Sequence, residues 1–175
     1  MKKFVAALAV VPLVFSLAAC GSSSNGNGDS KKITIGVVGN ETANQVLKDE
    51  AAKQGITIEY SEFTDYAQPN PAVDAGDNDM NRFQHIAYLA NYNVSSGKDL
   101  QIVGSTNIYP MAIFSKKHKK VDEIPQGGTI AIPNDSVNEA RALLLLKAQN
   151  LVTFKSEVHT PTHNDIDTGK SKVKV

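Results

Sequence analysis

Short apolar runs rich in β-branched residues alternate with segments of helical periodicity from Ile33 to Phe154, and this alternation most constrains the fold. The runs at 33–38 and 56–60 predict two buried strands. Between them, apolar residues recur every three or four positions and predict a helix over 43–51. A strand, a helix and a second strand in this order form a parallel crossover unit. The sequence therefore predicts an α/β fold with mainly parallel strands.

The same alternation continues toward the C-terminus. Helical patterns occur at 72–75, where neighbouring prolines weaken the signal, at 84–90, and from Ser136 onward. Ser136 and Glu139 match a capping box at the start of that last helix. Its four consecutive leucines, 143–146, predict a helix that is apolar around most of its circumference. Further strands are predicted at 79–83, 100–103, 111–114 and 129–132.

The first residues predict a targeting segment. Lys2 and Lys3 precede an apolar run that is too short to span a membrane and ends in Leu-Ala-Ala-Cys20. Small residues before a cysteine resemble the lipobox of bacterial lipoproteins, and the alternative is an ordinary signal peptide that ends near a cysteine. The resemblance implies that Cys20 is lipidated and anchors the chain to the extracytoplasmic face of the cell membrane. We expect a signal peptide at 1–19 and a flexible Gly/Ser/Asn tether at 20–32.

Composition excludes several functional classes. The chain has 18 basic and 18 acidic residues, so general electrostatic binding of nucleic acid is not expected. One cysteine excludes an internal disulfide and a cysteine-based zinc site. His159 and His163 are separated by Pro161, so a helix that presents both to a metal is not expected. No phosphate loop, dinucleotide motif or nucleophile–base pair is recognisable, so we expect neither a cofactor nor an enzyme.

Residues 155–175 differ from the rest of the chain. They are polar and have no helical period. The sequence predicts a loop and a tail with little to bury. One strand and one helix before them cannot enclose a core. We therefore expect the leucine face at 143–146 to stay partly exposed or to pack loosely.

Arg141 is a candidate ligand-binding residue. It lies near the start of a predicted helix, three residues after Asn138, so both side chains share one helical face. A guanidinium group there can hold a carboxylate through two hydrogen bonds, assisted by the helix N-terminus. The alternative is a surface arginine paired with a local acid such as Glu139.

Three aromatic residues and a histidine also cluster after predicted strands. Tyr66, Phe83 and Tyr88 can form a slot for an apolar or thioether side chain, or they can be core aromatics. His85 can be a general base, a metal ligand, a hydrogen-bond donor to a ligand or a structural residue. Ligands of open α/β sheets bind beyond the carboxyl ends of the strands, where these segments are expected.

Four motifs together resemble the NlpA lipoprotein family, the methionine-binding lipoproteins of ABC importers. They are Phe63-x-Asp-Tyr66-x-x-Pro-Asn70, Phe83-Gln-His85-x-x-Tyr88-Leu, Tyr109-Pro-Met111 and Ala131-Ile-Pro-Asn-Asp135-x-x-Asn138-x-x-Arg141. The resemblance implies a two-lobed periplasmic-binding-protein fold of the second class. It also implies that Tyr66, Phe83, His85 and Tyr88 line the pocket from the first lobe, and that Asn138 and Arg141 hold the amino-acid backbone from the second.

The resemblance predicts a C-terminally truncated member. We expect a first lobe at 33–115, a partial second lobe at 116–154 and the polar loop and tail at 155–175. The implied function is capture of L-methionine or a similar amino acid and its delivery to a permease and ATPase complex. The alternative is a surface lipoprotein without a transport role, or a remnant that no longer binds.

Overall fold

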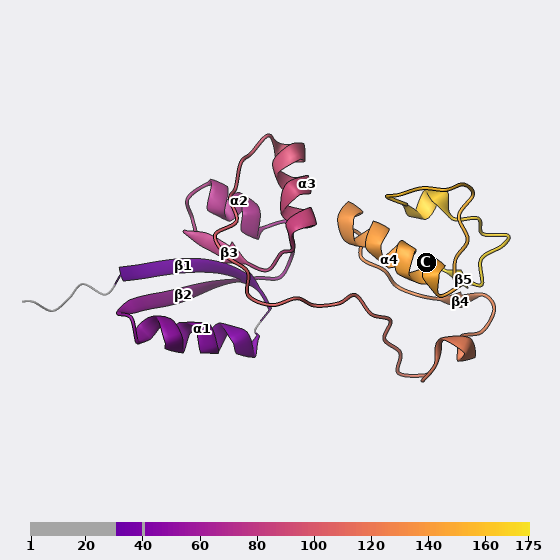
Figure 1. Ribbon diagram of the computed structural model, residues 1–175, viewed down its shortest axis with the longest axis horizontal. Coiled ribbons are helices and arrows are strands. Elements are labelled where there is room, and N and C mark those ends of the chain that lie inside the picture. Colours follow the sequence, from indigo (N-terminus) through magenta and orange to yellow (C-terminus); the bar gives the residue numbers. More distant parts are fainter. Residues whose placement is uncertain (1–30, 40) are drawn as a thin grey trace, which may run out of the picture.

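The computed structural model describes residues 31–39 and 41–175. Two bodies are visible, joined by a long extended stretch (Figure 1). We call residues 31–97 the sheet lobe, residues 100–114 the connector and residues 116–175 the helix lobe. The sheet lobe contains β1 (Lys31–Val38), α1 (Thr42–Ala52), β2 (Ile56–Phe63), α2 (Pro69–Asp74), β3 (Met80–Arg82) and α3 (Ile86–Ser96).

The sheet lobe is a parallel three-stranded sheet in the order β2-β1-β3. The central strand β1 places Ile35 opposite Tyr60 of β2 and Met80 of β3. Its buried residues pack against α1 on one face and form a small core of Ile35, Val37, Ala51 and Ile58. The predicted α/β class and parallel pairing are therefore confirmed.

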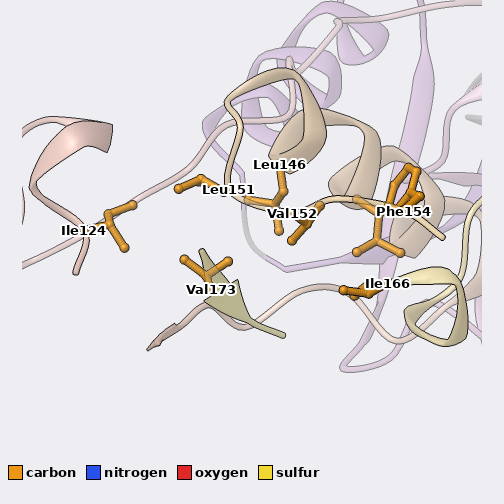
Figure 2. Packing of buried hydrophobic residues seen from close by; sticks show 8 residues of the cluster. Ile124, Leu146, Leu151, Val152, Phe154, Ile166 and Val173 are labelled. Carbon is orange, nitrogen blue, oxygen red and sulfur yellow. The ribbon is translucent and has the colours of Figure 1, made fainter. Parts of the chain in front are cut away.

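The helix lobe is built around α4 (Ser136–Ala148), with β4 (Gly128–Thr129) and β5 (Val173–Lys174) in a short parallel pair. Two 3₁₀ turns, Val121–Glu123 and His163–Asp165, complete it. Residues far apart in the chain supply its core: Ile124, Leu143, Leu146, Leu151, Val152, Phe154, Ile166 and Val173. Figure 2 shows the labelled members of this cluster converging between α4 and the C-terminal segment.

This core overturns two expectations. Leu143 and Leu146 are 0% and 2% exposed, so the leucine face is not left open. Residues 155–175 are not an unpacked tail, because Ile166 and Val173 are buried in the cluster and Phe154 forms an antiparallel bridge with Ile166. The segment lacks a helical or strand period because it contributes isolated apolar side chains from turns, and periodicity detects only regular elements.

Two predicted strands are absent. Residues 101–115 have no regular secondary structure, although 100–103 and 111–114 have strand-like sequences. Among the described residues no strand forms backbone hydrogen bonds with them, and a strand without a hydrogen-bonded neighbour has no ladder to stabilise it. The strand predicted at 129–132 is only partly formed: β4 covers Gly128–Thr129, and one further bond joins Ile130 N–H to the Lys174 carbonyl.

Helix starts also differ in detail. α2 begins at Pro69, which is tolerated because the first helical turn needs no N–H donor. The residue that caps α4 is Asp135 rather than Ser136, since the Asp135 carboxylate accepts a hydrogen bond from Asn138 N–H. The capping box predicted with Glu139 is therefore wrong, because Glu139 bonds elsewhere.

Candidate functional site at the junction of the two lobes

The loops that follow β2 and β3 place three of the candidate residues. Tyr66 follows β2, while Phe83 and His85 follow β3, so all three lie beyond the carboxyl ends of parallel strands. A cluster of three side-chain amides fastens these loops together. The Asn70 oxygen accepts bonds from Gln84 at 2.6 Å and Asn81 at 2.8 Å, and Asn70 is 1% exposed. This partly buried cluster ties together the loops that carry Tyr66 and Phe83.

Tyr66, Phe83 and Tyr88 form a contiguous aromatic trio. The Tyr66 and Phe83 rings lie 5.9 Å apart at an interplanar angle of 28°. Tyr88 meets Phe83 edge-on at 5.7 Å and Tyr66 at 6.5 Å. Tyr66 remains 51% exposed. The trio is therefore a half-open aromatic surface rather than an interior cluster.

His85 occupies the N-cap of α3 and also touches the helix lobe. Its Nδ1 accepts a hydrogen bond from Tyr88 N–H at 3.2 Å. Because Nδ1 accepts, the proton of the neutral ring lies on Nε2. Nε2 lies 3.0 Å from Oδ1 of Asn138 and donates to it. His85 therefore links the start of α3 to the start of α4.

The first turn of α4 orients Asn138 and Arg141. Asp135 accepts from Asn138 N–H at 2.9 Å and from the Asn138 side-chain amide at 3.1 Å. With its Nδ2 donating to Asp135, Asn138 turns Oδ1 toward the other side, where it accepts from His85 and, at 2.7 Å, from Nη1 of Arg141. Asp135 thus orients Asn138, and Asn138 in turn orients Arg141.

Arg141 has no acidic partner among the described residues. Glu139, the local acid that the alternative interpretation requires, instead accepts bonds from His163 N–H and Nδ1, both at 2.8 Å. Apart from its bond to Asn138, the half-buried guanidinium group has no hydrogen bond within residues 31–39 and 41–175. Its remaining donors are free for an incoming carboxylate.

Burial and nearby carboxylates change the pKa of Tyr88, which lies in the middle of the site. Burial raises the pKa of the Tyr88 hydroxyl, and the nearby carboxylates of Asp135 and Asp65 raise this pKa further. The effect of Asp135 crosses between the lobes, because Tyr88 lies on α3 and Asp135 caps α4. Tyr88 therefore stays neutral at physiological pH and contributes a ring and a hydroxyl rather than a charge.

The structure brings all six described candidate residues together in one connected set. It runs from Arg141 through Asn138 to His85, and on to Tyr88, Phe83 and Tyr66. Cys20 lies outside the described residues. Two surface pockets, of about 550 and 240 Å³, lie elsewhere, at the C-terminal end of α4 and beside α1. None of the six residues is fully buried and Tyr66 is 51% exposed, so they form an open shelf rather than an enclosed cavity.

The part of the chain that the structure describes was compared with two further features, a metal site and a membrane-spanning helix, and it contains neither. No group of three His, Cys, Asp or Glu side chains comes together as a metal site would require. No described helix is long and apolar enough to cross a membrane.

Sequence reasoning missed two supporting residues. Asp135 sits three positions before Asn138, and this spacing could have identified it as the cap that orients the amide. Arg82 gave no comparable signal. Its guanidinium group is held by Glu41 at 3.0 Å, Asn44 at 2.7 Å and Asn107 at 2.7 Å, which fixes the connector to the end of β3.

Comparisons with known proteins show the family to which the chain is similar. The family model described as NlpA lipoprotein matches residues 33–175. Outer membrane lipoprotein 3 of Mannheimia haemolytica is 42% identical over 137 residues, covering 75% of this chain and 51% of that protein. The D-methionine-binding lipoprotein MetQ of Escherichia coli is 38% identical over 180 aligned positions, covering 99% of this chain and 65% of that protein.

Solved structures give the same result. A nutrient binding protein from Burkholderia cenocepacia, bound to methionine, superposes with a TM-score of 0.73 at 38% identity. The match covers 81% of this chain and 62% of that one. The fold is therefore that of the two-lobed substrate-binding proteins. The chain spans about half to two thirds of the length of the relatives it matches.

Proposed function

The chain belongs to the NlpA lipoprotein family, and we propose that its shelf captures a free amino acid, methionine in particular. Arg141 would take the α-carboxylate through its free donors, while the aromatic trio would hold the side chain. The observation that carries the proposal is the guanidinium group of Arg141, which has no acidic partner among the described residues. Asn138 orients this group, and hydrogen bonds through Asn138 and His85 link it to the aromatic surface.

Methionine suits this surface for physical reasons. Its thioether is flexible and polarizable, and sulfur makes favourable contacts with aromatic ring edges. Phe83 and Tyr88 meet edge to face, and Tyr66 flanks them, so the shelf offers both ring faces and edges. The named relatives include a methionine-binding lipoprotein and a structure bound to methionine, which supports this choice of ligand.

Affinity should be low in the chain as it stands. Tight small-molecule sites bury most of the ligand surface. Here Tyr66 is 51% exposed, and none of the other five residues is fully buried. We therefore expect weak binding of methionine or none. A chain that shows no binding at all would be a lipoprotein without a transport role.

The relatives also support a proposal for where the chain acts and which partners it has. We infer that Cys20 carries a lipid that anchors the chain outside the cytoplasm, and that a permease and ATPase complex receives the ligand. No bond is made or broken in this scheme, so the chain acts as a receptor rather than an enzyme. Mass spectrometry of the mature protein checks the anchor: we expect the N-terminus at an acylated Cys20, and an unmodified Cys20 would refute it.

Arg141→Ala tests the carboxylate contact. The chain from residue 21 onward is titrated with L-methionine while side-chain NMR signals of the site are followed, since this readout detects millimolar binding. Losing a charge-assisted contact costs about 1.5–3 kcal/mol, which is roughly tenfold or more in affinity. Lys147→Ala, at the other end of α4, is the matched control. Equal affinities in the two variants would refute the assignment of Arg141.

A further inference from the structure

Charge is divided unevenly between the two lobes. The sheet lobe carries 5 basic and 9 acidic side chains, whereas the helix lobe carries 10 basic and 7 acidic ones. The balanced total of the whole chain therefore combines an acidic lobe with a basic lobe. Such an asymmetry between two halves of a chain indicates contact with a nucleic acid or a membrane. The helix lobe is thus the part of the described chain that suits an anionic partner.

Four lysines account for the basic excess of the helix lobe. They lie within residues 116–120, just before the 3₁₀ turn Val121–Glu123, and we call this segment the basic loop. All four are exposed: Lys116, Lys117, Lys119 and Lys120. In Figure 1 the basic loop lies at the lower edge of the view, away from α3 and from the start of α4. It is therefore separate from the six residues of the shelf.

The hydrogen bonds that shape the basic loop do not use its lysine side chains. Ser115 Oγ accepts from the backbone N–H groups of Lys117 and His118, at 3.1 and 3.0 Å. The Glu123 carboxylate accepts from the backbone N–H of Lys119 at 2.9 Å. Within residues 31–39 and 41–175, none of the four lysine ammonium groups forms an ion pair. The loop backbone is thus held in place while four positive charges stay free.

A fifth lysine adds to this charge from the C-terminal segment. Lys172 immediately precedes β5, and its Nζ donates to the Asp122 carbonyl at 3.4 Å. It therefore lies against the turn that follows the basic loop. That turn also contains two acids, Asp122 and Glu123, and neither forms an ion pair with a lysine in the described chain. The basic loop and its surroundings thus present five lysines against two acids.

We propose that the basic loop binds the anionic headgroups of phospholipids, so that the helix lobe rests on a membrane surface. Each lysine close to an anionic bilayer strengthens binding about fivefold, which corresponds to about 1 kcal/mol. The family consists of membrane-associated lipoproteins, so a bilayer is an anionic surface within reach. The acidic sheet lobe is repelled by the same surface, which favours one orientation of the chain. This inference requires neither methionine binding nor a lipid on Cys20.

Phospholipid headgroups suit the basic loop better than a nucleic acid does. Arginine forks bind phosphodiesters, and aromatic rings stack on bases. The basic loop contains no arginine, phenylalanine, tyrosine or tryptophan. Lysine is a compact, strongly hydrated charge on a flexible stem, which can follow headgroups that move within a bilayer. We therefore expect binding that depends on charge and is weakened by salt.

Vesicle sedimentation tests the proposal with the chain from residue 21 onward, which carries no lipid. Vesicles of equal parts phosphatidylglycerol and phosphatidylcholine should bind the chain at low salt about tenfold or more tightly than phosphatidylcholine vesicles do. High salt should release the chain. Lys119→Gln combined with Lys120→Gln removes two charges and should weaken binding about 25-fold. This variant keeps the bond from residue 119 to Glu123, because the backbone N–H is the donor.

Lys48→Gln combined with Lys53→Gln is the matched control. Both lysines are exposed, within and at the end of α1 in the acidic sheet lobe, and their loss changes the net charge equally. We expect this variant to bind as the parent does. A second measurement locates the contact: in anionic bicelles that contain a nitroxide-labelled phospholipid, the NMR signals of amides 116–120 should broaden more than those of α1.

Three kinds of result would overturn the proposal. Equal binding to anionic and neutral vesicles, or binding that high salt leaves unchanged, would show that charge is not the cause. Equal losses in the two double variants, or equal broadening of α1, would place the contact outside the basic loop. A larger shift of amides 116–120 with inorganic phosphate or a short oligonucleotide than with bicelles, at equal phosphate concentration, would make a soluble anion the partner.

Discussion

Leu143→Ala measures whether the helix lobe has a true core. Leu143 is 0% exposed and contacts a cluster whose members come from α4, from 151–154 and from the C-terminal segment. Removing its three outer carbons loses their transfer free energy and leaves a cavity. For a fully buried leucine the two effects together destabilise by about 3–5 kcal/mol.

Leu144→Ala is the matched control. Leu144 is the next residue of the same helix and is 39% exposed, so the same atoms are removed with the same change in helix propensity. We expect this variant to lose less than about 1 kcal/mol. The difference between the two variants, about 2 kcal/mol or more, then reports burial alone.

The assay is urea unfolding followed by far-ultraviolet circular dichroism, with hydrogen exchange of individual helices to locate the effect. The amides of α4 should exchange about thirtyfold faster or more in Leu143→Ala than in Leu144→Ala, because the difference of about 2 kcal/mol between the two variants corresponds to that factor. The amides of α1, in the separate core of the sheet lobe, provide an internal comparison. Equal losses in Leu143→Ala and Leu144→Ala would show that the leucine face is not buried and would refute the reasoning.

Three further predictions test single features. Gly36→Ala should destabilise the sheet lobe by about 1–3 kcal/mol in the same urea assay, because the added Cβ would lie 3.0 Å from the Phe63 ring and 3.2 Å from the Asn78 amide; an unchanged midpoint would contradict this packing. The Thr34 backbone N–H and hydroxyl both donate to Asp79 and hold the pKa of its carboxyl group below the ordinary value. This stabilisation is present above the ordinary pKa of about 3.9 and is lost as the pH falls through the lower folded value, so Asp79→Asn should lose stability at neutral pH and show a flatter acid dependence of unfolding. Asp135→Asn should lower the pKa of Tyr88, measured by tyrosinate absorbance against a Tyr88→Phe reference, while the helix keeps an equally good cap; an unchanged Tyr88 pKa would mean that α3 and α4 do not meet.

Elements that depend on local pattern were predictable from the sequence. The strands β1 and β2 and the helices α1, α3 and α4 lie where apolar periodicity places them. The loops after β2 and β3 were identified because parallel strands end at one edge of a sheet. The fold class was predictable for the same reason, since a strand, helix and strand order leaves few arrangements.

Elements that depend on distant partners were not predictable. The sequences at 100–103 and 111–114 favour strands, but a strand is stable only when it is hydrogen-bonded to another strand, and no strand in the described chain pairs with them. The burial of Ile166 and Val173 depends on contacts with α4 and with Leu151 and Val152. The pairing of Glu139 with His163 likewise joins residues 24 positions apart, which left the partner of Arg141 undecided from local sequence.

Contacts between residues far apart in the chain also determine how firmly the two lobes are held together at the site. The lobes are joined by the connector and, at the site, by the hydrogen bond between His85 and Asn138. One such bond contributes about 0.5–1.5 kcal/mol net, which is too little to hold two lobes in one orientation. A carboxylate on Arg141 would add bonds without displacing Asn138, because only one guanidinium N–H is in use. Firm closure of the shelf therefore has to come from groups beyond this bond, and the ligand itself can supply them through the remaining donors of Arg141.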